Sequence, residues 1–194
     1  MRRRKPSSKR WRNYSPAVVE AAQPTITFDV TINTCLGRAG GQALLARNWM
    51  LVTAESCTGG WIAKVITDLP GSSGWFERGF VTYSNAAKKE LLGVQETTLA
   101  AQGAVSAATV EEMTQGALTH SHAQIAVAVS GIAGPDGGSL DKPVGTVWLS
   151  WMRKDGAPRN QCHQFNGDRE SVRLQAVVAA LEGVLEIVND GGKR

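Results

Sequence analysis

The chain alternates between short apolar runs of strand length and longer segments in which apolar residues recur at helical spacing. The strand-like runs are residues 49–53, 80–83, 125–129 and 144–151, with a weaker one at 161–165. The run at 125–129 is uninterrupted, which is typical of a strand that is covered on both faces.

The segments between these runs have the spacing and the end signals of helices. Helices are indicated at residues 36–44, 58–67, 85–92, 107–118 and 169–188. Ser84, Ser106 and Asp168 are suited to N-cap positions, and Gly93 is suited to end the helix that begins at residue 85. Strands that alternate with helices predict an α/β fold, here a three-layer α/β/α sandwich with a mostly parallel or mixed central sheet.

Residues 1–31 differ from the rest of the chain. Pro6, Pro16 and Pro24 interrupt any helix there. Residues 25–32 alternate apolar and polar positions like a short strand. We therefore expect a basic and disordered N-terminal extension over residues 1–31, followed by one folded domain over residues 32–190.

The net charge of +4 suggests at first an affinity for nucleic acid. However, residues 1–12 hold seven of the 21 basic residues and none of the 17 acidic ones, so the remaining chain has a net charge of −3. We therefore expect no binding of nucleic acid except through this basic tail.

Several other classes of protein are excluded by composition. The three cysteines, Cys35, Cys57 and Cys162, are odd in number and widely spaced, which indicates neither a disulfide framework nor a zinc cluster. No apolar run reaches the roughly 18 residues that a membrane span requires. The basic N-terminus is not followed by the apolar segment of a secretory signal. We expect a cytoplasmic protein that does not bind membranes.

Small and polar residues interrupt the hydrophobic pattern after two of the predicted strands, at residues 53–60 and 130–138. Strand ends are where α/β proteins bind their ligands. Ser56 would lie between a strand and the N-terminus of a helix, whose free N–H groups favour a phosphate or the oxyanion of an attacked amide. The same serine would equally serve as a helix cap. The glycine-rich segment 130–138, which is no Walker A motif, either wraps a nucleotide or forms a plain turn.

A serine becomes a good nucleophile only when a base removes its proton. No histidine lies near Ser56 in the sequence, whereas Lys88 follows the run 80–83 by one helical turn. A lysine can act as this base if burial lowers its pKa. Spacing does not choose between Lys88 and the adjacent Lys89. Cys57 is either a rival nucleophile or a small buried residue.

At this point the residues resemble those of a known family. Thr53-Ala-Glu-Ser-Cys-Thr-Gly-Gly60, Arg78-Gly-Phe-Val-Thr-Tyr-Ser-Asn85, Ser130-Gly-Ile-Ala-Gly-Pro-Asp-Gly-Gly138 and Lys142-Pro-Val-Gly-Thr146 are similar to motifs of the CinA C-terminal domain family. The resemblance extends over residues 36–188. That family includes bacterial nicotinamide mononucleotide deamidases.

The resemblance implies a function and a site. The chain would hydrolyse the carboxamide of nicotinamide mononucleotide to nicotinate mononucleotide and ammonia in pyridine nucleotide salvage, as a homodimer and without a metal or another cofactor. Ser56 would be the nucleophile, Lys88 the base because it matches the pattern Tyr-Ser-Asn-x-Ala-Lys, and Tyr83 a helper. Substrate contacts would come from Glu55, Thr58, Gly59, Gly60, Ser130, Gly131, Gly134, Gly137, Thr146 and Arg169. The alternative is a catalytically silent paralogue that binds pyridine nucleotides and has a regulatory role in competence or DNA damage.

Overall fold

The computed structural model describes residues 26–190, with side chains from Leu36 onward. The strands are β1 (Leu51–Glu55), β2 (Phe76–Val81), β3 (Ile125–Gly131), β4 (Thr146–Arg153) and β5 (Arg159–Gln164). The helices are α1 (Ile26–Leu45), α2 (Trp61–Thr67), α3 (Asn85–Leu92), α4 (Glu96–Gln102), α5 (Ala107–Thr119) and α6 (Arg169–Asp190), with a short 3₁₀ helix η1 (Ser72–Gly74).

The five strands form one mixed sheet in the order β2-β1-β3-β4-β5. Strand β1 pairs in parallel with β2 and with β3, whereas β3 pairs with β4, and β4 with β5, in antiparallel fashion. Because β1, β2 and β3 run in the same direction, their carboxyl ends lie at one edge of the sheet. All five residues of β1 are buried.

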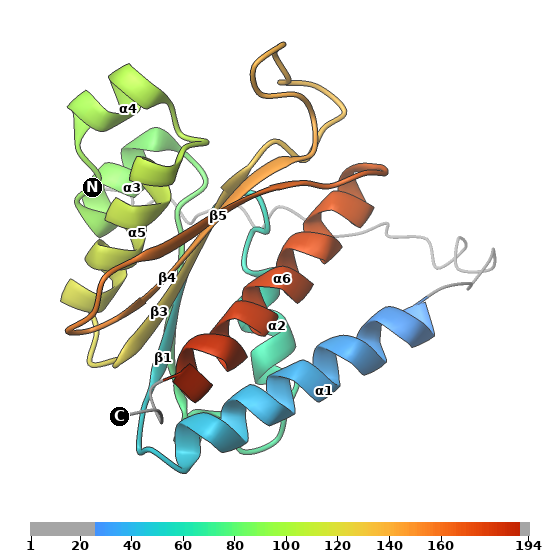
Figure 1. Ribbon diagram of the computed structural model, residues 1–194, viewed down its shortest axis with the longest axis vertical. Coiled ribbons are helices and arrows are strands. Elements are labelled where there is room, and N and C mark those ends of the chain that lie inside the picture. The colour runs from blue at the N-terminus through green and yellow to red at the C-terminus, as the bar shows by residue number, and fades with distance from the viewer. Residues whose placement is uncertain (1–25, 191–194) are drawn as a thin grey trace, which may run out of the picture.

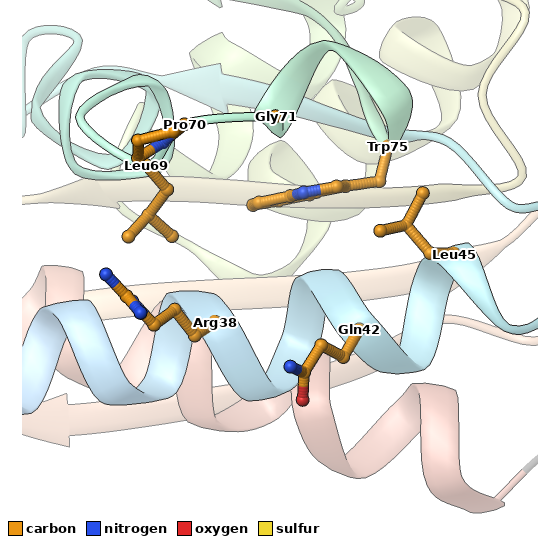
Figure 2. A pocket seen from close by; sticks show the side chains of 7 residues that line it. All are labelled: Arg38, Gln42, Leu45, Leu69, Pro70, Gly71 and Trp75. Atoms are coloured by element: carbon orange, nitrogen blue, oxygen red, sulfur yellow. The ribbon is translucent and has the colours of Figure 1, made fainter.

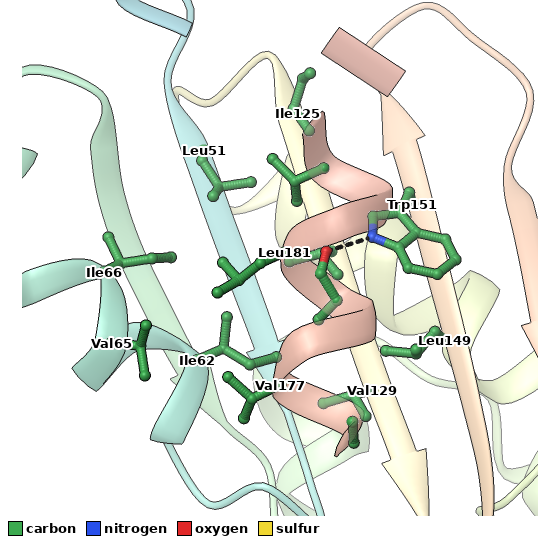
Figure 3. Close-up of a cluster of buried hydrophobic side chains, with 14 of the residues drawn as sticks. Leu51, Ile62, Val65, Ile66, Ile125, Val129, Leu149, Trp151, Val177 and Leu181 are labelled. Atoms are coloured by element: carbon green, nitrogen blue, oxygen red, sulfur yellow. Dashed lines mark hydrogen bonds between the residues drawn. The ribbon is translucent and has the colours of Figure 1, made fainter. Parts of the chain in front are cut away.

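Helices cover both faces of the sheet, so the predicted three-layer sandwich is confirmed (Figure 1). Helices α1, α2 and α6 lie on one face, and α3, α4 and α5 lie on the other. Side chains of successive strand residues point to opposite faces, so Leu51 packs in the first layer and Val52 in the second. In the first layer, Val129 and Leu149 of the sheet and Leu181 of α6 belong to one buried hydrophobic cluster (Figure 3).

The predicted helix ends are confirmed where a cap was expected. The Ser84 side chain accepts a hydrogen bond from the Ala87 N–H, and the Asp168 carboxylate accepts one from the Ser171 N–H. Ser106 caps α5 in the same way. Gly93 ends α3 in a left-handed conformation with φ of 70°. These local signals were sufficient to predict the helix ends, because each cap is formed by residues only a few positions apart in the chain.

The strand predicted at residues 25–32 is wrong for residues 26–32, which form the first part of α1. The helix continues to Leu45 and packs against α6, and this tertiary contact outweighs the local preference of an alternating segment for β structure. The boundary expected at residue 31 therefore falls inside a helix. The disorder expected for the basic extension concerns mainly residues 1–25, which lie outside the described residues.

Two smaller differences concern the segment between β1 and α5. Strand β2 begins at Phe76, earlier than the expected run, and ends before Tyr83. Helix α4 was not predicted, because Leu99 is its only buried residue and a single apolar position gives no periodic signal. Within residues 26–190, none of the helices combines the length and apolar character that crossing a membrane requires.

Candidate active site

The turn that follows β1 carries Ser56 and is held in place by its neighbours. The Ser56 N–H donates to the carbonyl of Val129 at 3.0 Å, which fixes the turn to strand β3. Gly59 and Gly60 have φ angles of 63° and 93°, a left-handed conformation that other residues rarely adopt. The glycines thus let the chain reverse direction before α2 begins at Trp61.

Glu55 lies beneath this turn and is fully buried. Its carboxylate accepts hydrogen bonds from the Thr58 hydroxyl at 2.7 Å and from the N–H groups of Gly60 at 3.0 Å, Ile62 at 3.0 Å and Ala63 at 2.9 Å. The negative charge therefore satisfies the N-terminal donors of α2 from inside the protein.

Glu55, Thr58 and the start of α2, which were expected at the substrate, are joined to one another by these bonds. Their polar groups bond one another and are not directed to a ligand. Two N–H groups of the turn remain, because those of Cys57 and Thr58 have no acceptor among the described residues. Free N–H groups in a turn beside a serine are suited to an oxyanion.

Lys88 reaches the serine from α3. Its Nζ lies 2.8 Å from the Ser56 Oγ and donates to the Thr82 carbonyl at 2.8 Å, and the residue is only 1% exposed. No carboxylate contacts this amine among the described residues. Burial lowers the pKa of Lys88 to about 8, so a useful fraction is neutral near neutral pH. A neutral amine has a lone pair that accepts the serine proton.

The two alternatives that the sequence left open at these positions are distinguished by their surroundings. Lys89 is exposed and forms an ion pair with Glu96 on the surface, away from the serine. Cys57 is buried, and burial raises the pKa of its thiol to about 11. A thiol with this pKa is almost entirely protonated at neutral pH, so it is a poor nucleophile. The geometry favours Ser56 with Lys88.

Ser56 and Lys88 line a cavity of about 230 Å³ at the carboxyl ends of the parallel strands. Its lining residues are Ser56, Cys57, Tyr83, Asn85, Lys88, Ala104, Val105, Ser130, Gly131, Ala133 and Arg169. The cavity is thus lined in part by residues of the three motif segments 53–60, 78–85 and 130–138 and by the first residue of α6.

Arg169 lies at this cavity and connects two of its walls. Its Nη2 donates to the Tyr83 hydroxyl at 2.8 Å, and its Nη1 donates to the Gly134 carbonyl at 2.9 Å. Tyr83 is 62% exposed, so this side of the cavity is open to solvent. A guanidinium at an open rim is suited to an anionic group of a ligand.

Five other expected contact residues do not line the cavity, one of them Gly134, whose carbonyl accepts the hydrogen bond from Arg169. Gly59 and Gly60 shape the serine turn, and Gly137 lies on an exposed part of the β3–β4 loop. The Thr146 hydroxyl donates to the Pro143 carbonyl at 2.7 Å and lies 3.0 Å from the Gln164 side-chain oxygen, so it is used within the fold.

The sequence reasoning also missed residues that the structure brings to the site. Asn85 stands in one of the quoted motifs and could have been chosen. Ala104, Val105 and Ala133 carry no reactive group, so no chemical signal marked them. Arg173 could have been found, since it follows Arg169 by one helical turn and therefore shares its helix face.

A larger cavity of about 450 Å³ lies elsewhere, between α1 and the segment after α2 (Figure 2). Leu45, Leu69 and Trp75 give it an apolar lining, and Arg38 is its one charged side chain. The described residues that line it include neither a nucleophile nor a base. Size alone would favour this cavity, but the paired serine and lysine favour the smaller one as the candidate active site.

Comparison with known proteins agrees with this geometry. Residues 34–188 match the profile of the CinA C-terminal domain. The chain is 61% identical over 145 residues to nicotinamide-nucleotide amidohydrolase PncC of Enterobacter agglomerans, an alignment that covers 75% of this chain and 88% of that protein. It is 60% identical over 144 residues to the protein of the same name in Escherichia coli K12, covering 73% of this chain and 86% of that protein.

Solved structures show the same fold. The crystal structure of the competence/damage inducible protein CihA from Agrobacterium tumefaciens matches with a TM-score of 0.79 at 42% identity, covering 88% of this chain and 99% of that one. A CinA superfamily protein from Klebsiella pneumoniae matches with a TM-score of 0.78 at 42% identity, covering 81% and 98%.

Proposed function

Because the chain belongs to the CinA C-terminal domain family, we propose that it is an amidohydrolase that converts nicotinamide mononucleotide to nicotinate mononucleotide and ammonia. Relatives at 60% and 61% identity bear the name nicotinamide-nucleotide amidohydrolase. The observation that carries the proposal is the 2.8 Å contact between the buried Lys88 amine and the Ser56 hydroxyl in a cavity. The reaction would recover pyridine nucleotides for NAD synthesis.

The first half of the proposed reaction forms an acyl-enzyme. Neutral Lys88 takes the Ser56 proton while Oγ attacks the carboxamide carbon, and the electron pair of the C=O bond moves to oxygen. The N–H groups of Cys57 and Thr58 donate to this oxyanion. One such donor is typically worth about 3 kcal/mol of transition-state stabilisation. The Lys88 ammonium then protonates the amide nitrogen, the C–N bond breaks, and ammonia leaves.

The second half releases the product. Lys88, again neutral, removes a proton from a water molecule that attacks the ester carbon. The C–O bond to Ser56 breaks, and Oγ recovers a proton from the Lys88 ammonium. One amide and one water thus give one carboxylic acid and one ammonia. The same amine acts as base and acid in turn, which requires a pKa near the working pH, and burial lowers the pKa of Lys88 to about 8.

The cavity dimensions suggest how the nucleotide binds. A volume of about 230 Å³ is below the roughly 300 Å³ at which pockets for whole small molecules begin. We therefore propose that it holds the nicotinamide ring beside Ser130 and Gly131. The ribose phosphate would extend to the open rim, where the Arg169 guanidinium binds the phosphate and Tyr83 fixes that guanidinium.

Ammonia release from three substrates tests this function. We expect turnover of nicotinamide mononucleotide and at least a tenfold lower kcat/KM for the riboside and for free nicotinamide, which lack the phosphate. Equal rates on all three would contradict the proposed phosphate contact. Tight calorimetric binding of the nucleotide without ammonia release would instead indicate the silent regulatory paralogue.

The protein is further proposed to act as a cytoplasmic homodimer. Val81 and Leu91 are 48% and 45% exposed, although both are large and apolar. Such residues are suited to a subunit interface. Light scattering after gel filtration should give twice the 20.7 kDa mass of one chain, and a monomer would contradict the dimer.

A further inference from the structure

Two arginines on the same face of α6 contact different parts of the site. Arg169 lines the cavity, whereas Arg173 does not. The Arg173 Nε donates to the Cys57 carbonyl at 3.0 Å, and its Nη2 donates to the Thr58 carbonyl at 2.8 Å. We propose that Arg173 is a positioning residue for the reaction: its bond to the Cys57 carbonyl directs the Thr58 N–H, one of the two N–H groups proposed to face the oxyanion, and its bond to the Thr58 carbonyl holds the next peptide of the turn. This inference rests on the proposed function.

The peptide geometry explains how a bond to a carbonyl can direct an N–H group. The Cys57–Thr58 bond is trans, since the Gly134–Pro135 bond is the cis bond recorded among the described residues. In a trans peptide the C=O and the N–H of one plane point in opposite directions. When Arg173 holds the Cys57 carbonyl, the Thr58 N–H is therefore directed away from the guanidinium.

The turn's own backbone bonds, from the Gly59 N–H to the Ser56 carbonyl at 3.0 Å and from the Trp61 N–H to the Thr58 carbonyl at 3.3 Å, leave the Cys57 carbonyl to Arg173. Gly59 and Gly60 follow directly, and glycine has more conformational freedom than any other residue. Glu55 holds the N–H groups at the far side of the turn, while Arg173 holds its carbonyls. The peptide planes between these two charged side chains are thus fixed from both ends.

The surroundings of Arg173 also suit this role. Its guanidinium carbon lies 5.1 Å from the centre of the Trp61 ring, so the side chain is held flat against α2. Among the described residues, no carboxylate forms an ion pair with Arg173. Its positive charge therefore remains available to favour negative charge that develops at the turn.

Kinetics of Arg173→Lys and Arg173→Gln test the proposal, with Arg159→Lys as the matched control. Arg159 also lies over a tryptophan, at 6.0 Å from the Trp151 ring, and it contacts Glu186 of α6, far along the helix from the serine turn. Because loss or misplacement of one oxyanion donor costs about a hundredfold, we expect kcat to fall about tenfold to a hundredfold in the Arg173 variants. KM should change less than about threefold, because substrate-binding residues are untouched. The control should match the wild type.

Two further readouts separate positioning from general damage. The pH at half-maximal kcat should stay at the wild-type value, because Lys88 keeps its contacts. Amide resonances of Cys57 and Thr58 in ¹⁵N spectra should shift in Arg173→Lys and stay in place in Arg159→Lys.

Wild-type kcat in both Arg173 variants, or unchanged resonances of the turn, would overturn the proposal. If the wild type does not hydrolyse nicotinamide mononucleotide, the proposed function fails. In that case, the amide resonances of Cys57 and Thr58 in the Arg173 variants still test whether Arg173 positions the turn. Arg173→Lys keeps the positive charge and roughly the length of the side chain. If Arg173→Gln does not fold, the measurements on Arg173→Lys therefore still test the proposal.

Discussion

At the scale of single residues, the chemistry depends on the burial of Lys88. The amine has two contacts, the Ser56 hydroxyl and the Thr82 carbonyl, and neither carries a negative charge. Removal from water therefore disfavours the ammonium form and lowers its pKa to about 8. The same burial that makes an ammonium unfavourable supplies a neutral base.

The pH dependence of activity follows from this pKa. Lys88 must be neutral to take the serine proton, so kcat/KM should rise with pH, reach half its maximum near pH 8 and level off above it. Initial rates between pH 6 and about pH 10 measure this profile. An activity that falls as pH rises through the same range would exclude Lys88 as the base.

The sequence was most informative about residues that carry reactive groups. Ser56, Lys88, Tyr83 and Arg169 were expected and lie around one cavity. The bonds of Glu55 to α2 were not foreseen, because an acidic residue beside a nucleophile has the same sequence signature whether it faces a ligand or a helix end. Only the positions of the α2 N–H groups distinguish the two cases.

At the scale of elements, α2 begins without a side-chain cap at its own N-cap residue, Gly60. Glu55 supplies the missing acceptor from the end of β1, so a residue of the strand stabilises the following helix. This bond pattern ties the strand, the serine turn and the helix into one unit.

Glu55→Gln should therefore destabilise the fold. An amide has one acceptor oxygen where the carboxylate has two, and it brings buried N–H donors next to the donors of α2. Because hydrogen bonds to charged groups contribute about 1.5–3 kcal/mol, the free energy of unfolding in urea should fall by about that amount. Glu90→Gln, at an exposed position of α3, is the control and should be neutral. A neutral Glu55→Gln would contradict the capping role.

Elements were predictable where the signal is local. The capped helices α3, α5 and α6 were found because side-chain oxygens bond backbone N–H groups three residues away. The start of α1 was missed because its sequence alternates in a strand-like way, whereas the helix as a whole contacts α6, more than a hundred residues later in the chain.

At the scale of the whole molecule, the mixed sheet determines where the site lies. Strands β1 and β3 are parallel neighbours, so the serine turn and the glycine-rich loop leave the same edge. Strand β2 on the other side of β1 delivers Tyr83 and then Lys88 to that edge. Segments far apart in sequence thus meet at one cavity, as the alternation of strands and helices indicated.

The packing of α1 gives a prediction for truncated chains. Deletion of residues 1–45 removes α1, including the fully buried Leu44, and exposes the layer formed by α2 and α6. Since loss of one buried leucine already costs about 2–5 kcal/mol, this chain should not fold cooperatively in thermal unfolding. Deletion of residues 1–25 leaves α1 and the family match at 34–188 intact, and this control should keep its ammonia release. A fully stable chain without α1 would contradict the role of this helix.

The central claim, a serine amidohydrolase, is tested most directly by Ser56→Ala against its control Ser73→Ala, an exposed serine in η1. Ammonia released from nicotinamide mononucleotide is the quantity to measure, at pH 8 and at equal amounts of folded protein. Removal of a catalytic serine typically costs about a millionfold in kcat, so Ser56→Ala should release no ammonia above background, while Ser73→Ala matches the wild type. Full activity of Ser56→Ala would contradict the account.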